Sequence, residues 1–137
     1  MVIEHNIKVK HKAGVVVYRD SSNGGIEVLL VSARKHKDSW VFPVGTVEDH
    51  ETLQVTAARE CEEESGYLVE TEDEIGTVQD KGGKTSTFFT FYKAQITGEK
   101  EDYEKDRERK WVGTERLEQT VAKIFIPIAK SFIQSIN

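Results

Sequence analysis

Residues 45–67 read GTVEDHETLQVTAARECEEESGY, and most of this stretch is typical of a helix that carries acid on one face. Asp49 is a plausible N-cap, and Gly66 is a plausible C-terminal stop. The sequence therefore predicts a helix over about 51–65, preceded by a short polar loop and followed at once by a β-like segment.

Three glutamates of this helix, Glu60, Glu63 and Glu64, stand at positions i, i+3 and i+4, so they share one face. Like charges this close repel one another, and a bound cation would relieve the repulsion. An adjoining apolar stripe recurs at a spacing of four: Leu53, Ala57 and Cys61. Hard carboxylate oxygens suit magnesium or manganese far better than zinc. The alternative is an acidic helix face that is only solvated.

The spacing around these glutamates matches the Nudix box, G-x5-E-x7-R-E-U-x-E-E-x-G-U with U apolar, at all seven fixed letters. The matching residues are Gly45, Glu51, Arg59, Glu60, Glu63, Glu64 and Gly66. Cys61 and Tyr67 occupy apolar positions where aliphatic residues are commoner. The chain thus resembles the Nudix hydrolase family. The resemblance implies an α/β (α+β) Nudix fold, with a mixed β-sheet between helices in an α/β/α sandwich.

The same resemblance implies that Glu60, Glu64 and the Gly45 carbonyl bind Mg²⁺ or Mn²⁺, and that Glu63 is a further ligand or the general base. Such metal ions polarise phosphoryl oxygens, and a carboxylate can take the proton of the attacking water. The expected activity is hydrolysis of a phosphoanhydride bond. Glu104, Glu108 and Glu115 stay alternatives for the base.

The other box residues are expected to be structural. Arg59 can reach Glu63 at i+4 and orient it. Glu51 lies at the helix start, where the helix dipole favours negative charge. Gly66 ends the helix.

Residues 28–43 (VLLVSARKHKDSWVFP) and 107–112 (RERKWV) resemble the diphosphoinositol polyphosphate and diadenosine polyphosphate hydrolase branch. A heavily phosphorylated substrate needs many cations, and the chain supplies them near two predicted strands. The candidate substrate-binding residues are Lys10, Lys12, Arg34, Lys35, Lys84, Arg109 and Lys123. One departure is the run 43–46 (PVGT), where this branch has a glycine triplet after the proline. The alternatives are a smaller nucleotide substrate, such as ADP-ribose, a damaged nucleoside triphosphate or an RNA cap, and a non-catalytic Nudix module.

Bulk composition bounds these hypotheses. A chain of 137 residues with 37% hydrophobic content predicts one domain over 1–137. Its apolar runs are too short to cross a membrane, and its first residues predict no signal peptide. A single cysteine suits the cytosol or nucleus. The net charge of −5 argues against general nucleic-acid binding, and the sequence leaves the oligomeric state open.

Propensity and periodicity predict the remaining elements. Strands are expected over 8–19, 26–32, 67–78 and 85–96, with a short strand at 111–112. The charged stretch 99–110 is expected to be a loop. Two further helices are expected over 114–122 and 127–136, with Pro127 in the first turn of the second.

Overall fold

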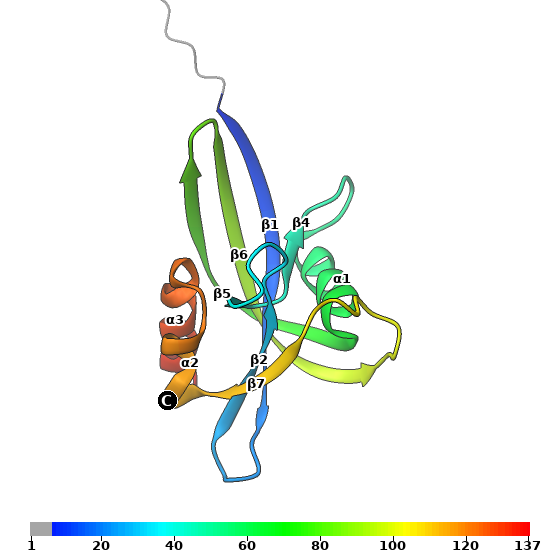
Figure 1. Cartoon of the computed structure of the whole chain (residues 1–137), viewed down its shortest axis with the longest axis vertical. Helices are drawn as coiled ribbons and strands as arrows, with labels where there is room; N and C mark the ends of the chain where they lie inside the picture. Colours follow the sequence, from blue (N-terminus) through cyan, green and yellow to red (C-terminus); the bar gives the residue numbers. More distant parts are fainter. Residues whose placement is uncertain (1–6) are drawn as a thin grey trace, which may run out of the picture.

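The structure is a computed structural model that describes residues 7–137. Its strands form one seven-stranded mixed sheet, with β3-β2-β1-β6-β5 along its main path (Figure 1). β4 pairs with β1 and β7 pairs with β2, and among the strands of residues 7–137 only β1 and β6 pair in parallel. The strands are β1 (Lys8–Asp20), β2 (Ile26–Ser32), β3 (Trp40–Val41), β4 (Val44–Thr46), β5 (Tyr67–Gly82), β6 (Thr85–Glu99) and β7 (Arg109–Gly113).

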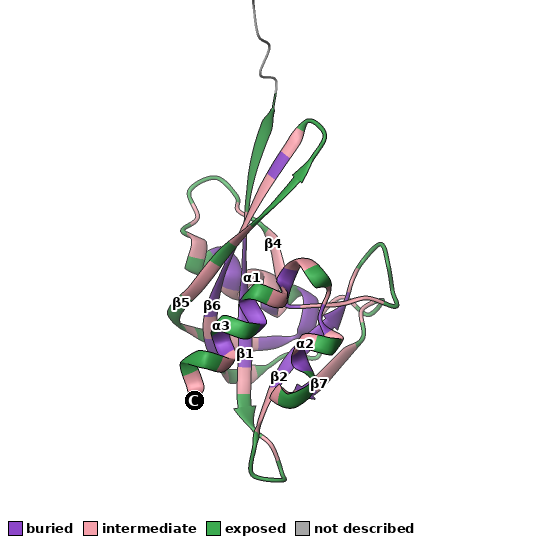
Figure 2. Ribbon diagram, turned by 90° about the vertical axis from the view of Figure 1, so that its left-hand side faces the viewer, coloured by how far each residue is buried: buried purple, intermediate pink, exposed green. Residues whose placement is uncertain are grey.

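Helices cover both faces of this sheet. Helix α1 (Leu53–Ser65) packs on one face through Ala57 and Cys61, which contact β1 and β6 residues. Helices α2 (Thr114–Thr120), η1 (Lys123–Phe125) and α3 (Ile126–Ile136) cover the other face. Figure 2 shows the buried residues concentrated between these layers. The predicted α/β/α sandwich is therefore confirmed.

Strand β1 contributes buried side chains to two hydrophobic cores, one on each face of the sheet. Val15 faces the α1 side and Val16 faces the side of α2 and α3, and both are fully buried. This follows from the pleat, because successive side chains of a strand point to opposite faces. A continuous apolar run in the sequence therefore indicates a strand with helices packed on both of its faces. The outer ends of β1, β5 and β6 project beyond these layers as an exposed arm (Figure 2).

The predicted start of the acidic helix is wrong by two residues, and Asp49 is not its N-cap. The N-cap is Thr52, whose hydroxyl oxygen accepts a hydrogen bond from the Val55 amide at 3.2 Å. His50 has a φ of 70°, which turns the chain away from a helical path before Glu51. The predicted stop at Gly66 is confirmed, because this residue has a φ of 81° and its amide donates to the last turn.

The other predicted elements are present with shifted ends. β5 and β6 are longer than predicted, so the charged loop narrows to residues 100–108. α2 ends at Thr120 because the next residues leave the helix, and the Ala122 amide instead donates to the Trp40 carbonyl at 2.8 Å. Pro127 lies in the first turn of α3, as predicted.

Within residues 7–137, none of the helices has the length and apolar character that crossing a bilayer requires. The prediction that no signal peptide is present falls largely on residues 1–6, which lie outside the described part of the chain.

Candidate active site

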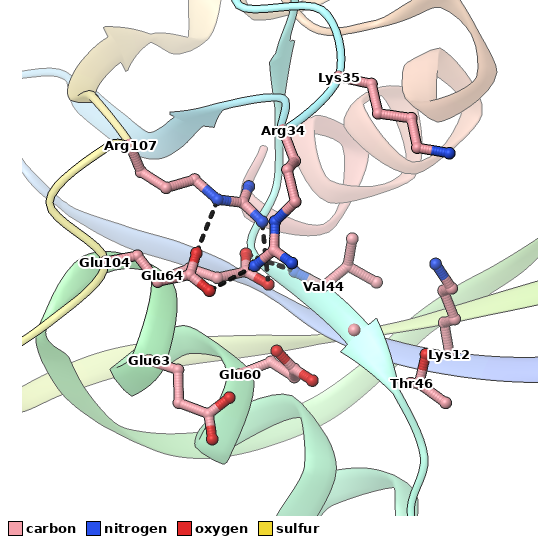
Figure 3. A pocket seen from close by; sticks show the side chains of 11 residues that line it. Lys12, Arg34, Lys35, Val44, Thr46, Glu60, Glu63, Glu64, Glu104 and Arg107 are labelled. Carbon is pink, nitrogen blue, oxygen red and sulfur yellow. Dashed lines mark hydrogen bonds and ion pairs between the residues drawn. The ribbon is translucent and has the colours of Figure 1, made fainter.

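A cavity of about 550 Å³ opens where β4 meets α1. Glu60, Glu63 and Glu64 of α1 form its acidic side, and cationic side chains of β1 and of the segment after β2 line it opposite them (Figure 3). A volume of this order suits a small molecule. The three predicted carboxylates therefore face one shared space that is also lined by positive charge.

The three carboxylates differ in how far water reaches them. The Glu64 side chain is 3% exposed, Glu60 is 15% exposed and Glu63 is 50% exposed. Burial raises the pKa of Glu64, and the neighbouring Glu60 charge adds to the rise, while Arg107 opposes it. The Val44 amide donates to the Glu64 carboxylate at 3.3 Å and fixes its orientation. Glu63 is thus the carboxylate most open to an incoming water molecule.

Gly45 allows the backbone of β4 to lie directly against the acidic helix. A Cβ atom at this position would meet the Glu60 carboxyl carbon at 2.0 Å. Only glycine therefore permits the Glu60 carboxylate to lie beside this backbone, which carries the Gly45 carbonyl. Carboxylate and carbonyl oxygens are the donor type that magnesium prefers.

The oxygen donors of this site are of the type that magnesium binds. Among residues 7–137, no three side chains of His, Cys, Asp or Glu already form a ligand group for a metal. Magnesium usually binds through one or two carboxylates and keeps several waters or substrate oxygens as its remaining ligands. Glu60, Glu64 and the Gly45 carbonyl could hold such an ion.

Arg59 joins the start of the box to the helix. Its guanidinium donates to both carboxylate oxygens of Glu51, at 2.7 and 2.9 Å, and to the Thr46 carbonyl at 3.1 Å. These contacts hold the pKa of Glu51 at about 2, together with a hydrogen bond from Thr56. The predicted contact with Glu63 is also present, at 3.2 Å. Glu51 precedes the helix, so hydrogen bonds rather than the first turn's dipole stabilise its charge.

Three of the seven predicted substrate-binding residues line the cavity: Lys12, Arg34 and Lys35. Lys10 instead lines a separate cavity of about 590 Å³, between the start of β1 and residues 46–50. Lys84 is exposed beside the β5–β6 turn, and Lys123 is exposed in η1. Val44 and Thr46, which replace the glycines expected in this branch, both line the main cavity.

Arg109 also lies outside the cavity. Its guanidinium donates to the Ser65 carbonyl at 2.6 Å and lies over the rings of Tyr67 and Tyr103, with centroid distances of 4.6 and 4.8 Å. These contacts fasten the start of β7 to the end of α1.

Sequence reasoning missed Arg107, which lines the cavity with its side chain only 10% exposed. Its guanidinium donates to the Ser32 carbonyl and to Glu104, each at 2.9 Å. Glu104, which the sequence offered only as an alternative base, also lines the cavity. The charged composition of residues 100–108 gives no sign of which side chain turns inward. The direction depends on pairing with Ser32, 75 residues earlier in the chain.

Known proteins share sequence and fold with this chain. The family profile described as "NUDIX domain" matches residues 10–134. Diphosphoinositol polyphosphate phosphohydrolase 2 of Rattus norvegicus is 32% identical over 110 residues, which cover 77% of this chain and 59% of the rat protein. An 8-oxo-(d)GTP phosphatase of Mycolicibacterium smegmatis is 35% identical over 82 residues, which cover 52% of this chain and 25% of that protein.

The fold also matches solved structures. The crystal structure of Ap4A hydrolase from C. elegans superposes with a TM-score of 0.77 at 21% identity, covering 94% of this chain and 99% of that one. At this identity the likeness shows the fold alone. The chain spans 59% of the length of its rat relative, so that protein's substrate does not transfer with the alignment.

Proposed function

The chain belongs to the Nudix family, and from this premise we propose that it hydrolyses a phosphoanhydride bond in a small polyanionic substrate, with Mg²⁺ or Mn²⁺ as cofactor. The observation that carries the proposal is the shared cavity, in which the box carboxylates face Lys12, Arg34 and Lys35. Carboxylates suit a cation, and the opposing cations suit phosphate groups.

Glu60, Glu64 and the Gly45 carbonyl would hold the metal, which when bound supplies positive charge that polarises the phosphoryl group. Glu63, the most exposed of the three carboxylates, takes a proton from the water that attacks phosphorus. The anhydride P–O bond breaks, and its bridging oxygen leaves with the departing phosphoryl fragment. Arg59, 3.2 Å from Glu63, positions this carboxylate and does not touch the substrate.

We propose diphosphoinositol polyphosphates or diadenosine polyphosphates as the substrate class. Several cations around one cavity favour substrates with many phosphates, and the name of the rat relative points the same way. A smaller nucleotide is the second candidate, which the name of the mycobacterial relative favours. The intact set of box carboxylates argues against a non-catalytic module.

The buried, unpaired Cys61 thiol supports a reducing compartment, the cytosol or nucleus. The match over residues 10–134 supports a single domain over 1–137.

The test compares kcat/KM for a diphosphoinositol polyphosphate, diadenosine hexaphosphate, ADP-ribose and 8-oxo-dGTP with Mg²⁺. The double variant Lys12→Ala/Lys35→Ala should lower turnover of the first two by about 100-fold, because each charged contact is worth about 1.5 kcal/mol or more. The matched control is Lys81→Ala/Lys130→Ala, which removes two exposed lysines outside the cavity.

Preference for ADP-ribose or 8-oxo-dGTP, with little effect of the double variant, would favour the smaller nucleotides. Failure to hydrolyse any of the four would count against hydrolysis itself.

A further inference from the structure

The Glu104 carboxylate lies between two guanidinium groups inside the cavity. Arg34 donates to one of its oxygens at 2.5 Å, and Arg107 donates to the other at 2.9 Å (Figure 3). The three residues come from distant parts of the chain, the segment after β2 and the 100–108 loop. An anion held by two arginines beside a hydrolytic site occupies the position that a phosphate group would be expected to take.

Guanidinium groups bind carboxylates and phosphates with the same paired hydrogen bonds, and phosphate carries the greater charge. We propose that Arg34 and Arg107 form a phosphate subsite beside the box carboxylates, and that Glu104 fills this subsite as an internal anion until substrate arrives. The inference rests on the proposed function, because its ligand is a phosphate group of the hydrolysed substrate.

The position of the Arg107 guanidinium does not depend on Glu104 alone. Its guanidinium also donates to the Ser32 carbonyl at 2.9 Å and lies 3.7 Å from the Glu64 carboxylate, and its side chain is 10% exposed. These contacts remain when the Glu104 carboxylate leaves. Arg107 is therefore the preorganised half of the subsite, and Arg34, 64% exposed, is the adaptable half.

Glu104 can leave without opening its loop. Its amide donates to the Glu63 carbonyl at 2.9 Å, which anchors the backbone to α1. Its side chain is 27% exposed, so rotation of side-chain bonds alone brings the carboxylate to solvent. An incoming phosphate thus exchanges with one carboxylate, and the loop keeps its position.

This exchange makes Glu104 an intramolecular competitor of anions. The test measures binding of inorganic tripolyphosphate by calorimetry in metal-free buffer. Glu104→Gln, which keeps the shape and removes the charge, should tighten binding by about tenfold, since a charge-assisted hydrogen bond contributes on that order. The matched control, Glu118→Gln, removes one charge on α2 outside the cavity and should change binding by less than about twofold, as expected for an exposed surface charge.

A second variant separates competition from general electrostatics. Arg34→Gln should weaken tripolyphosphate binding by no more than about threefold in the otherwise native chain, where Glu104 already occupies Arg34. In the Glu104→Gln background the same change should weaken tripolyphosphate binding by about tenfold, because Arg34 is then available to the anion. Arg34 is largely exposed, so both variants should fold, which circular dichroism checks.

The proposed subsite would be overturned if Glu104→Gln and Glu118→Gln changed tripolyphosphate affinity equally. It would also be overturned if Arg34→Gln weakened that affinity equally in the two backgrounds. The measurement uses neither metal nor turnover. A chain inactive on every pyrophosphate could still show the predicted coupling, and an active chain could lack it, so the two proposals fail separately.

Discussion

Replacing Gly45 with alanine should disable the site without unfolding the chain. The added Cβ would lie 2.0, 2.2 and 2.5 Å from the three heavy atoms of the Glu60 carboxyl group. Ordinary contact between such atoms is about 3.5–4.0 Å, so the carboxylate must move by about 1.5 Å. Neither the strand nor its pairing with Ala13 demands glycine, because the residue has no positive φ.

The cost should fall on function and much less on stability. The Glu60 carboxylate is the far end of a flexible side chain, so we expect a loss in unfolding free energy of about 1 kcal/mol, the low end for overpacking. A misplacement of about 1 Å at a reacting centre can cost about 100-fold in rate. We therefore expect kcat with Mg²⁺ to fall by about 100-fold, with weaker Mn²⁺ binding.

The assays are electron paramagnetic resonance of free Mn²⁺ during titration, steady-state hydrolysis, and thermal unfolding. Gly82→Ala is the matched control, because a Cβ at Gly82 meets nothing within 4 Å and the residue also has no positive φ. Wild-type Mn²⁺ affinity and kcat in Gly45→Ala would refute the reasoning that this close approach places Glu60 for metal binding.

Three further outcomes are expected. Glu64→Gln should lower turnover at least about 100-fold while the thermal unfolding temperature changes little. Even the loss of groups that only support metal ligands lowers activity by up to about 100-fold. A fully active variant would show that Glu64 is not a metal ligand. The Arg59 guanidinium holds the pKa of Glu51 at about 2, below its usual 4.5, so its charge stabilises the fold above pH 4.5 and this contribution disappears toward pH 2. The urea midpoints of wild type and Glu51→Gln should therefore converge as the pH falls over that window, and a constant gap would contradict this. Burial raises the pKa of Cys61 to about 12, so dithiobis-nitrobenzoate at pH 8 should label no thiol in the folded chain and one in urea; labelling without urea would show an accessible thiol.

Local patterns predicted the acidic helix well because its face and its stop are set within a few residues. The stripe of Ala57 and Cys61 is buried, and Gly66 ends the helix. The helix start was misjudged because Asp49 and Thr52 are both good caps. The positive φ of His50, which decides between them, follows from the turn and not from propensity.

Which cations reach the cavity was not predictable, because strand register decides it. Lys12 pairs with Thr46 at the end of β4, where the cavity opens. Lys10 lies two residues farther along β1, about 6.6 Å away, beyond the last pair with β4. Both lysines point to the same side of the strand, because side chains two residues apart in a strand share a face, but only Lys12 lies beside the carboxylates. Alternation gives a face, and pairing between distant segments gives the position along it.

The last glycine of the box links the local pattern to the long-range one. A Cβ at Gly66 would meet the Lys100 carbonyl at 2.6 Å and the Tyr103 ring at 2.7 Å, so the loop after β6 lies directly on this residue. The Lys100 amide donates to the Gly66 carbonyl at 2.7 Å. The loop seated there carries Glu104 and Arg107 into the cavity. Gly66 therefore ends helix α1 and also provides the surface on which the proposed phosphate subsite is assembled. This close contact is a second requirement for glycine that helix capping alone does not reveal.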